Sequence, residues 1–473
     1  MLDKRSFYID GQWVEPDSEE IYDVVNPATE EKIARITLGS RTDLDQAVAA
    51  ARKAFAGYAA ASVAQRLNLL EQFRRVYVRR YDEMADLITQ ELGAPRTLSR
   101  EQQAETGLGH LDAFIAALKT FRFKETLADG DVLLREPVGV CGLITPWNWP
   151  VNQIALKVLP ALAAGCTCVL KPAELTPLSA ILYAEMIHEA GFPPGTFNLV
   201  NGDGATVGSS MASHPDIDMM SFTGSTRAGI AVSKAAADNI KRVTLELGGK
   251  SPNIVFADAD FQTAVQQGVG DCMNNTGQSC DAPTRMLVEK KVFAQVEAMV
   301  KAAVENLTVG DPHAEGPHMG PLVSETHFRR VQALINTALD EGSRLLTGGP
   351  GRPDGFEKGF YCRPTVFTHV SNSMTIAREE VFGPVLALIP FDTQEQAIAI
   401  ANDTPYGLAA YVHSSDPERC RSVARKLRAG MVHINGGGIK YGAPFGGYKM
   451  SGNGREGGIL GLEEFTEVKV LHY

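Results

Sequence analysis

The fold class follows from the segment Val138-Gly139-Val140-Cys141-Gly142-Leu143-Ile144, which reads as a buried strand that leads into an apolar helix. Helical spacing follows over Val151 to Ala164, and the next strand-like run is Cys168-Val169-Leu170. The alternation repeats with a helix over Leu178 to Ala190 and strand-like runs that end with Met219 to Thr223. Short apolar strands that alternate with helices are typical of a parallel, doubly wound sheet covered by helices.

A second alternation of strands and helices runs from Ser251-Pro252-Asn253-Ile254-Val255-Phe256 through Val432-His433-Ile434. Two shorter runs, Phe121-Arg122-Phe123 and Val132-Leu133-Leu134, are separated by Asp129-Gly130 and predict a two-stranded ribbon. No internal repeat or long linker is visible. The chain therefore reads as two α/β domains with a small β appendage.

The composition is that of an ordinary globular protein, with 473 residues that are 44% hydrophobic and 21% charged. The net charge of −11 argues against a general nucleic-acid or anionic-membrane binder. The longest apolar stretch, Val158 to Leu170, is too short to span a bilayer, and no apolar segment near Met1 predicts a secretory signal. Seven irregularly spaced cysteines suit a reducing cytoplasm, and because none stands at zinc-binding spacing we expect no metal site.

Three side chains at separate points of the sequence offer the parts of an acyl-transfer site. Cys280 is a thiol nucleophile, Glu246 is a carboxylate able to activate water, and Asn148 offers an amide N–H to an oxyanion. The ten histidines show no pairing with Cys280, which disfavours a Cys–His hydrolase. We therefore expect chemistry that passes through a thioester.

Two segments at strand ends are candidates for nucleotide binding. The segment Phe222-Thr223-Gly224-Ser225 lies at a strand-to-helix junction, where glycine lets the backbone approach a pyrophosphate. The standard G-x-G-x-x-G fingerprint is absent, so a plain tight turn explains this segment equally well. Lys171-Pro172-Ala173-Glu174 follows another strand and could contact a ribose or a phosphate. Taken alone, this tetrapeptide is better explained as a solvated charged turn.

Seven motifs, which appear in order over nearly the whole chain, resemble those of the NAD(P)-dependent aldehyde dehydrogenase superfamily. They are Pro146-Trp147-Asn148-Trp149-Pro150, Lys171-Pro172-Ala173-Glu174, Phe222-Thr223-Gly224-Ser225, Glu246-Leu247-Gly248-Gly249-Lys250, Gly277-Gln278-Ser279-Cys280, Glu380-Val381-Phe382-Gly383-Pro384 and Pro444-Phe445-Gly446-Gly447-Tyr448-Lys449. A further segment, Asp281-Ala282-Pro283-Thr284-Arg285, resembles a bacterial branch described as acting on varied aliphatic and aromatic aldehydes.

The resemblance implies oxidation of an aldehyde to a carboxylic acid. Cys280 would be the nucleophile, Asn148 the oxyanion donor, and Glu246 the base for hydrolysis of the thioester. Lys157 and Glu467 match positions that some members use to relay protons. Two alternatives remain: a coenzyme-A-acylating dehydrogenase and a catalytically silent structural relative. Retention of Glu246 disfavours the first, and the intact catalytic set disfavours the second.

The resemblance also implies a set of cofactor contacts. These residues are Lys171, Glu174, Gly204, Gly208, Phe222, Ser225, Leu247, Glu380 and Phe382. Lys171 and Glu174 would contact the adenosine ribose, whereas Glu380 and Phe382 would clamp the nicotinamide ribose. A carboxylate at Glu174 would repel a 2′-phosphate, so we expect NAD, with NADP possible.

Three structural units are implied in the same way. Residues 1–118 and 137–246 would form the NAD(P)-binding domain, and residues 247–450 the catalytic domain. Residues 119–136 and 451–473 would form an element that docks on a neighbouring subunit, which predicts a homodimer or homotetramer. The expected partner is a small-molecule aldehyde, with no nucleic acid or membrane.

Asp281, directly after the nucleophile, departs from the family, where a small or apolar residue is more common. A carboxylate that faced the thiol would raise the pKa of Cys280, whereas one turned into the protein would bind backbone N–H groups, and we favour this structural role. The residues expected around the substrate are Trp149, Gln153 and Leu156 in the pocket, with Lys440 and Tyr441 near its mouth. None of them identifies one aldehyde.

Overall fold

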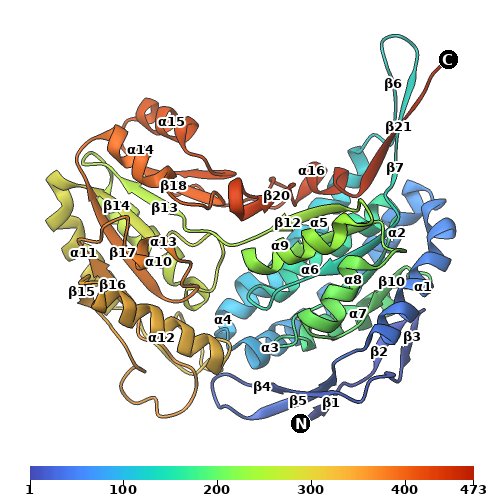
Figure 1. Ribbon diagram of the computed structural model, residues 1–473, viewed down its shortest axis with the longest axis horizontal. Coiled ribbons are helices and arrows are strands. Elements are labelled where there is room, and N and C mark those ends of the chain that lie inside the picture. The colour runs from blue at the N-terminus through green and yellow to red at the C-terminus, as the bar shows by residue number, and fades with distance from the viewer.

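The computed structural model describes all 473 residues and contains two large sheets side by side (Figure 1). The first sheet has eight strands in the order β20-β12-β11-β8-β9-β10-β2-β3. Its parallel strands are β8 (Val140–Ile144), β9 (Thr167–Lys171), β10 (Phe197–Leu199), β11 (Met219–Thr223) and β12 (Arg242–Glu246). Its antiparallel edges are β2 (Phe7–Ile9), β3 (Gln12–Val14) and β20 (Gly452–Asn453). The predicted strands and their parallel pairing are confirmed.

Helices cover both faces of this sheet because its buried strands are apolar on both sides. Leu143 and Leu170 face one layer, whereas Val140 and Val169 face the other. The first layer contains α5 (Glu105–Thr120), α6 (Pro150–Ala164) and α7 (Leu178–Glu189). The second contains α1 (Arg41–Ala59), α8 (Ser209–Ser213) and α9 (Thr226–Ala237). Helix α6 is buried on nearly every side, as its uniformly apolar sequence requires.

The N-terminal part of the chain adds further helices and a small sheet. The helices are α2 (Val63–Arg79), α3 (Tyr81–Leu92) and α4 (Arg96–Leu98), and a π-helical turn, η1 (Ser99–Ala104), joins α4 to α5. A three-stranded sheet, which the sequence analysis did not predict, contains β1 (Leu2–Asp3), β4 (Ile21–Val25) and β5 (Lys32–Thr37). This part of the chain therefore packs beside the first large sheet.

The second large sheet has seven strands in the order β15-β16-β17-β14-β13-β18-β19. They are β13 (Pro252–Val255), β14 (Arg285–Glu289), β15 (Arg344–Thr347), β16 (Thr365–Thr368), β17 (Val385–Phe391), β18 (Ala409–His413) and β19 (Met431–Ile434). All pairs are parallel except β15 with β16. The accompanying helices are α10 (Phe261–Met273), α11 (Phe293–Glu305), α12 (Glu325–Asp340), α13 (Thr375–Arg378), α14 (Gln394–Asn402) and α15 (Pro417–Lys426). The second predicted alternation is confirmed.

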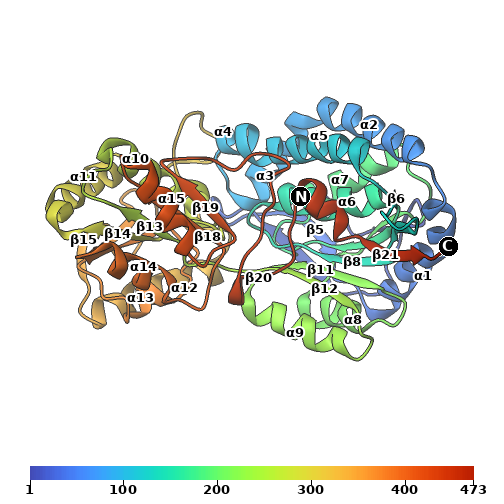
Figure 2. The same cartoon turned by 90° about the horizontal axis from the view of Figure 1, so that it is seen from above.

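A β-ribbon projects from the molecule, with the C-terminus near its tip (Figure 1). Its strands are β6 (Lys124–Thr126), β7 (Val132–Pro137) and β21 (Thr466–Leu471), and β21 pairs with β7 along its whole length. Figure 2 shows the C-terminal segment returning from the second sheet to the first before it enters this ribbon. The sequence placed the first ribbon strand at Phe121 to Phe123, three residues too early. Those two aromatic rings contact each other and pack against the core instead.

The parallel strands of the first sheet bring several motifs to one edge. Strands β9, β11 and β12 end at Lys171, Thr223 and Glu246, and the segment around Asn148 follows the end of β8. The carboxyl ends of neighbouring parallel strands lie at the same edge of a sheet, where such folds bind ligands. None of the helices is long and apolar enough to cross a membrane.

Candidate active site

Asn148 lies in the short connection between β8 and α6, and its side chain is almost fully buried at 3% exposure. Helix α6 begins at Pro150, which needs no N–H partner at this position. The amide Nδ2 of Asn148 donates to the carbonyl of Gln278, at 2.9 Å. This hydrogen bond uses one of the two hydrogens on Asn148 Nδ2, so the second hydrogen can donate to another acceptor.

The nucleophile loop, residues 274–280, follows α10 through a tight left-handed turn. Asn275 and Thr276 both have positive φ, at 50° and 58°, and Gly277 follows at 72°. A Cβ at Gly277 would lie 2.2 Å from the carbonyl oxygen of Gly383, so only glycine fits there. Strained backbone of this kind persists where the surrounding structure holds it, often at functional sites. The turn directs Cys280 into a cavity.

The cavity has a volume of about 670 Å³ and lies between the two large sheets. The predicted site residues that line it are Asn148, Gln153, Glu174, Ser225, Glu246, Leu247, Cys280, Glu380 and Phe382. Phe222 is buried in β11 and its ring packs beneath Gly224. The three catalytic candidates therefore share one space, although more than one hundred residues separate Asn148 from Cys280.

The surroundings of Cys280 oppose ionisation of its thiol. Enclosure by protein raises the pKa of Cys280 well above its ordinary value, and the nearby carboxylates of Asp281, Glu380 and Glu246 raise it further. Burial also raises the pKa of Asp281. The carboxylate of Asp281 makes no hydrogen bond to a neighbouring residue, whereas its backbone carbonyl accepts one from the Tyr411 hydroxyl, at 3.2 Å. The carboxylate of Asp281 therefore raises the pKa of Cys280 and also accepts a hydrogen bond from its own backbone N–H, which is part of the backbone-binding role that was expected.

Glu246 is a buried carboxylate at the end of β12, and neither of its oxygens has a hydrogen-bond partner. Burial and the neighbouring Glu456 raise the pKa of Glu246 well above its ordinary value, while Lys157 opposes that shift. Lys157 Nζ contacts the carboxylate of Glu456 at 2.6 Å and the hydroxyl of Ser221 at 3.1 Å. A raised pKa makes a carboxylate a stronger base, and its free oxygens can accept a proton from a bound molecule.

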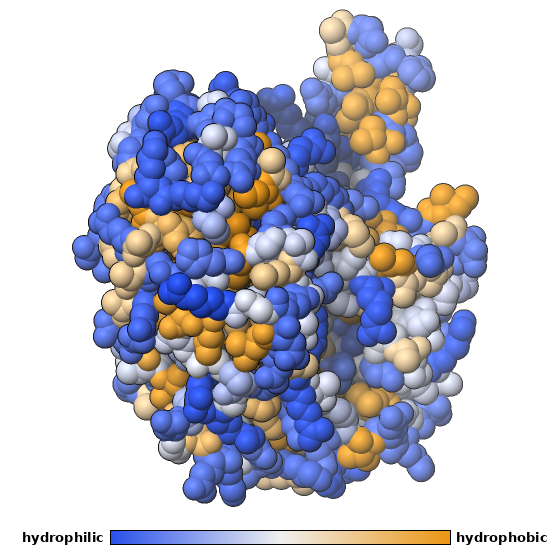
Figure 3. All heavy atoms as spheres, turned by 60° about the vertical axis from the view of Figure 1, so that its left-hand side comes forward, coloured by the Kyte–Doolittle hydropathy of each residue, from blue (hydrophilic) through white to orange (hydrophobic).

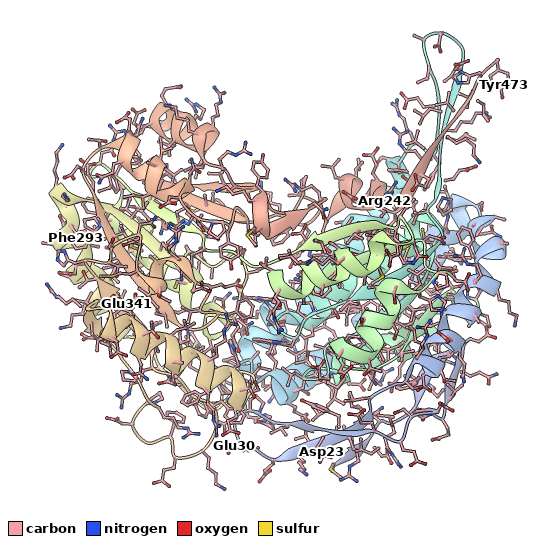
Figure 4. All side chains as sticks on the ribbon, in the orientation of Figure 1. Asp23, Glu30, Arg242, Phe293, Glu341 and Tyr473 are labelled. Carbon is pink, nitrogen blue, oxygen red and sulfur yellow. The ribbon has the colours of Figure 1, made fainter.

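Glu467 was expected at a position that relays protons, and this expectation is wrong. Its side chain is half-exposed and pairs with Arg242 at 2.7 Å, at the foot of the ribbon (Figure 4). Glu467 lies in β21, and the pairing of β21 with β7 carries it away from the cavity. Glu456 occupies the expected place beside Lys157, although no motif in the sequence indicated it.

Glu380 and Phe382 form one wall of the cavity and are held by helix α12. Glu380 Oε1 accepts from the N–H of Gly249 at 3.0 Å, and burial raises the pKa of Glu380 to about 7. Phe382 has a positive φ of 60°, and its carbonyl accepts from His327 Nε2 at 2.7 Å. Arg330 donates to the carbonyl of Glu380 at 3.0 Å. No local pattern in the sequence connects His327 or Arg330 with residues about fifty positions later.

Lys171 and Glu174 lie at another part of the same strand edge. Lys171 is only 3% exposed, and its Nζ donates to the carbonyls of Pro172 at 2.9 Å and Gly202 at 2.6 Å. This burial rules out the solvated charged turn for Lys171. Glu174 lines the cavity and lies 3.7 Å from Lys171. Gly208 lies beside Lys171, at the end of the π-helical turn η2 (Gly204–Gly208).

Only one of the expected substrate-pocket residues lines the cavity. Gln153 does so, and its buried Oε1 has no hydrogen-bond partner. Trp149 donates from Nε1 to the hydroxyl of Ser279 at 2.8 Å, and Leu156 is part of the core. The two residues expected at the mouth, Lys440 and Tyr441, are exposed. All three catalytic candidates thus line the cavity, whereas two of the three residues expected in the substrate pocket, Trp149 and Leu156, do not.

Comparison with known proteins gives a consistent result. The profile of the Aldehyde dehydrogenase family matches residues 13–471. A protein of a Pseudomonas species named 3-succinoylsemialdehyde-pyridine dehydrogenase is 53% identical over 472 residues, covering 100% of this chain and 99% of that protein.

Solved structures agree with the sequence matches. The crystal structure of an aldehyde dehydrogenase from Bartonella henselae has a TM-score of 0.99 at 50% identity, covering 100% of both chains. Aldehyde dehydrogenase C of Pseudomonas syringae, as a cysteine-to-alanine mutant with NAD+ and octanal, has a TM-score of 0.98 at 53% identity, covering 99% of this chain and 96% of that one.

Proposed function

The chain belongs to the aldehyde dehydrogenase family, and we propose that it oxidises an aldehyde to a carboxylic acid with NAD through a thioester on Cys280. The family resemblance and the architecture of two parallel-sheet units predicted from the sequence are both confirmed. The observation that carries the proposed mechanism is that Cys280, Glu246 and Asn148 line one cavity.

The residues around the cavity fit NAD. Thr223 Oγ1 is buried in the cavity wall without a hydrogen-bond partner, and Gly224 and Ser225 follow at the N-terminus of α9. A helix N-terminus favours a pyrophosphate, and the carboxylate of Glu174 disfavours the extra phosphate of NADP. Glu380 would hold the nicotinamide ribose. When bound, NAD supplies the acceptor for the hydride.

In the first stage, the sulfur of Cys280 forms a bond to the aldehyde carbon. Glu246 is a base available for the thiol proton, since it lines the same cavity and its two oxygens are unpartnered. The carbonyl oxygen becomes an oxyanion, which accepts from the second Nδ2 hydrogen of Asn148 and from the backbone N–H of Cys280. That N–H makes no hydrogen bond to another residue. Loss of hydride from the carbon restores the carbonyl and leaves a thioester.

Glu246 first releases the thiol proton, and in the second stage it takes a proton from water while the water oxygen attacks the thioester. The carbon–sulfur bond breaks and the carboxylic acid leaves. Glu246 then returns its proton to the sulfur, so that Cys280 is again a thiol. The buried ion pair of Lys157 and Glu456 lies near enough to affect the pKa of Glu246, and we propose that it takes up the proton that Glu246 releases.

The two alternatives considered from the sequence receive no support. A coenzyme-A-acylating enzyme would not need a buried carboxylate with two free oxygens beside the thioester. Product analysis with and without coenzyme A separates the two routes, because only hydrolysis yields the free acid in its absence. A silent relative would not need the complete catalytic set.

The ribbon supports a homodimer or homotetramer. Hydrophobic side chains gather on the projecting ribbon (Figure 3), and Val468 and Val470 are 58% and 39% exposed. Exposed apolar strands of this kind are usually covered by a partner.

We assign residues 1–118 and 137–246 to cofactor binding, 247–450 to catalysis, and 119–136 with 451–473 to oligomerisation. Seven free cysteines support a cytoplasmic location.

The direct test is NADH formation at 340 nm with octanal and NAD, before and after the substitution Cys280→Ala. We expect the substitution to abolish turnover while NAD binding persists. Retained turnover in the substituted protein would exclude the thioester route. A panel of short, medium-chain and aromatic aldehydes would then define the substrate.

A further inference from the structure

The backbone carbonyl of Asn148 is held by two buried amides. Asn275, on the nucleophile loop, donates from Nδ2 at 2.8 Å. Gln103, on the π-helical turn η1, donates from Nε2 at 3.1 Å. The orientation of the Gln103 amide is fixed, because a carbonyl oxygen can only accept a hydrogen bond. Asn148 is therefore held at its backbone by these two residues and at its side chain by Gln278.

Of these three partners, only Gln103 comes from outside the nucleophile loop. Asn275 and Gln278 lie within a few residues of Cys280, so they can move together with it. Gln103 belongs to the helical layer of the first unit and has no exposed surface. It thus connects Asn148 to a part of the protein that is independent of the nucleophile. The π-helical turn is itself a local departure from the α-helix, and such turns often occur at functional sites.

We propose that Gln103 is a positioning residue for the oxyanion donor. The Gln103 hydrogen bond restrains the peptide unit after Asn148 and so fixes the direction in which the Asn148 side chain leaves the backbone. A donor acts on an oxyanion only when it is preorganised within hydrogen-bond distance of the developing charge. Gln103 touches neither substrate nor cofactor in this role. The inference rests on the proposed function, because it assumes that Asn148 stabilises an oxyanion.

The alternative is that Gln103 merely satisfies a buried carbonyl. Asn275 already satisfies that carbonyl, so this role alone does not require a second donor. The two explanations differ in what they predict for catalysis. A positioning residue changes the rate of the step that forms the oxyanion, and it has no effect once the donor is gone. A purely structural residue affects stability whether or not the donor is present.

The test uses the full-length protein with NAD and octanal, and it measures the rate and amplitude of the first NADH burst. Gln103→Met keeps the volume and removes the hydrogen bond. Because Asn275 remains, we expect the burst rate to fall roughly fivefold, the effect of one neutral hydrogen bond, with the amplitude and the NAD affinity unchanged. The matched control is Gln65→Met, which removes a hydrogen bond that Gln65 accepts from the Ser62 N–H at 2.8 Å and which does not line the cavity. This control should keep the wild-type burst rate.

The decisive comparison repeats Gln103→Met in protein that already carries Asn148→Ala. The backbone carbonyl remains in this background, but the amide to be positioned is absent, so Gln103→Met should have no further effect. An equal loss of burst rate in both backgrounds, or no loss in the wild-type background, would overturn the inference. A failure of the wild-type protein to form any NADH would instead reject the proposed function.

A second variant keeps the inference testable if Gln103→Met does not fold. In Gln103→Glu, the introduced carboxyl can donate to the Asn148 carbonyl only when it is protonated, and burial favours that form. The burst rate relative to wild type should be near unity at acid pH and should fall as the pH rises. A ratio that does not change with pH would contradict the positioning role.

Discussion

NAD binding should weaken as the pH falls below neutrality, because the carboxyl of Glu380 then takes up a proton. Burial raises the pKa of Glu380 to about 7, although the Gly249 N–H and the charges of Arg330 and Lys250 oppose that rise. The ionised group accepts hydrogen bonds from ribose hydroxyls more strongly than the protonated group does. NAD therefore binds best above pH 7, and its affinity is lost as the pH falls through that value.

The magnitude follows from the kind of hydrogen bond. A hydrogen bond to a charged group contributes about 1.5–3 kcal/mol and a neutral one about 0.5–1.5 kcal/mol, so protonation should cost about 1.4 kcal/mol, or tenfold in Kd. Glu380 is partly exposed to the cavity, and water there screens its charge. We therefore expect a rise in Kd of roughly three- to tenfold between pH 8 and pH 5.5, levelling off once Glu380 is protonated.

The assay is isothermal titration of NAD into the wild-type protein and Glu380→Gln at several pH values. The variant should bind NAD with a Kd that changes little with pH, because its amide does not titrate. This variant is needed because burial also lowers the pKa of Lys250 to about 7, in the same range. His327 does not interfere, since burial lowers its pKa to about 4. A flat profile for the wild type, or an unchanged slope in the variant, would refute the assignment of Glu380.

Three further outcomes are expected. Glu246→Gln should give a burst of NADH and then stall with an acyl group on Cys280 that mass spectrometry detects, and an unchanged steady-state rate would show that another base serves. Asp281→Asn should lower the pKa of Cys280, because a nearby negative charge is removed. The pH midpoint of Cys280 alkylation by iodoacetamide would then move down, and a midpoint that stays in place would contradict this. Val470→Arg should reduce the mass found by light scattering, since it places a charge on the exposed ribbon, whereas an unchanged assembly would exclude the ribbon as the interface.

Several features could be predicted from the sequence because they depend on local order. The strand at Val140–Ile144 and the helix at Pro150–Ala164 follow from runs of apolar residues with the appropriate period and length. The catalytic candidates Cys280 and Glu246 could be named because they stand in short motifs with a recognisable order. Their placement around one cavity agrees with that interpretation.

Other features depended on contacts between distant residues. The ribbon begins at Lys124 and not at Phe121, because the rings of Phe121 and Phe123 pack against the hydrophobic core. Lys171 is buried, although a charged turn usually faces water, because two backbone carbonyls accept from its Nζ. Neither outcome is visible from composition or periodicity.

The sequence alone determined the order of strands and helices, the family, and the chemical groups available for catalysis, since these reside in neighbouring residues. Only the tertiary structure decided that Glu456 and not Glu467 meets Lys157, and that Gln103 holds Asn148. The Lys157–Glu456 contact joins residues 299 positions apart. Its existence depends on how strands and helices pack in space, which the local pattern around either residue does not specify.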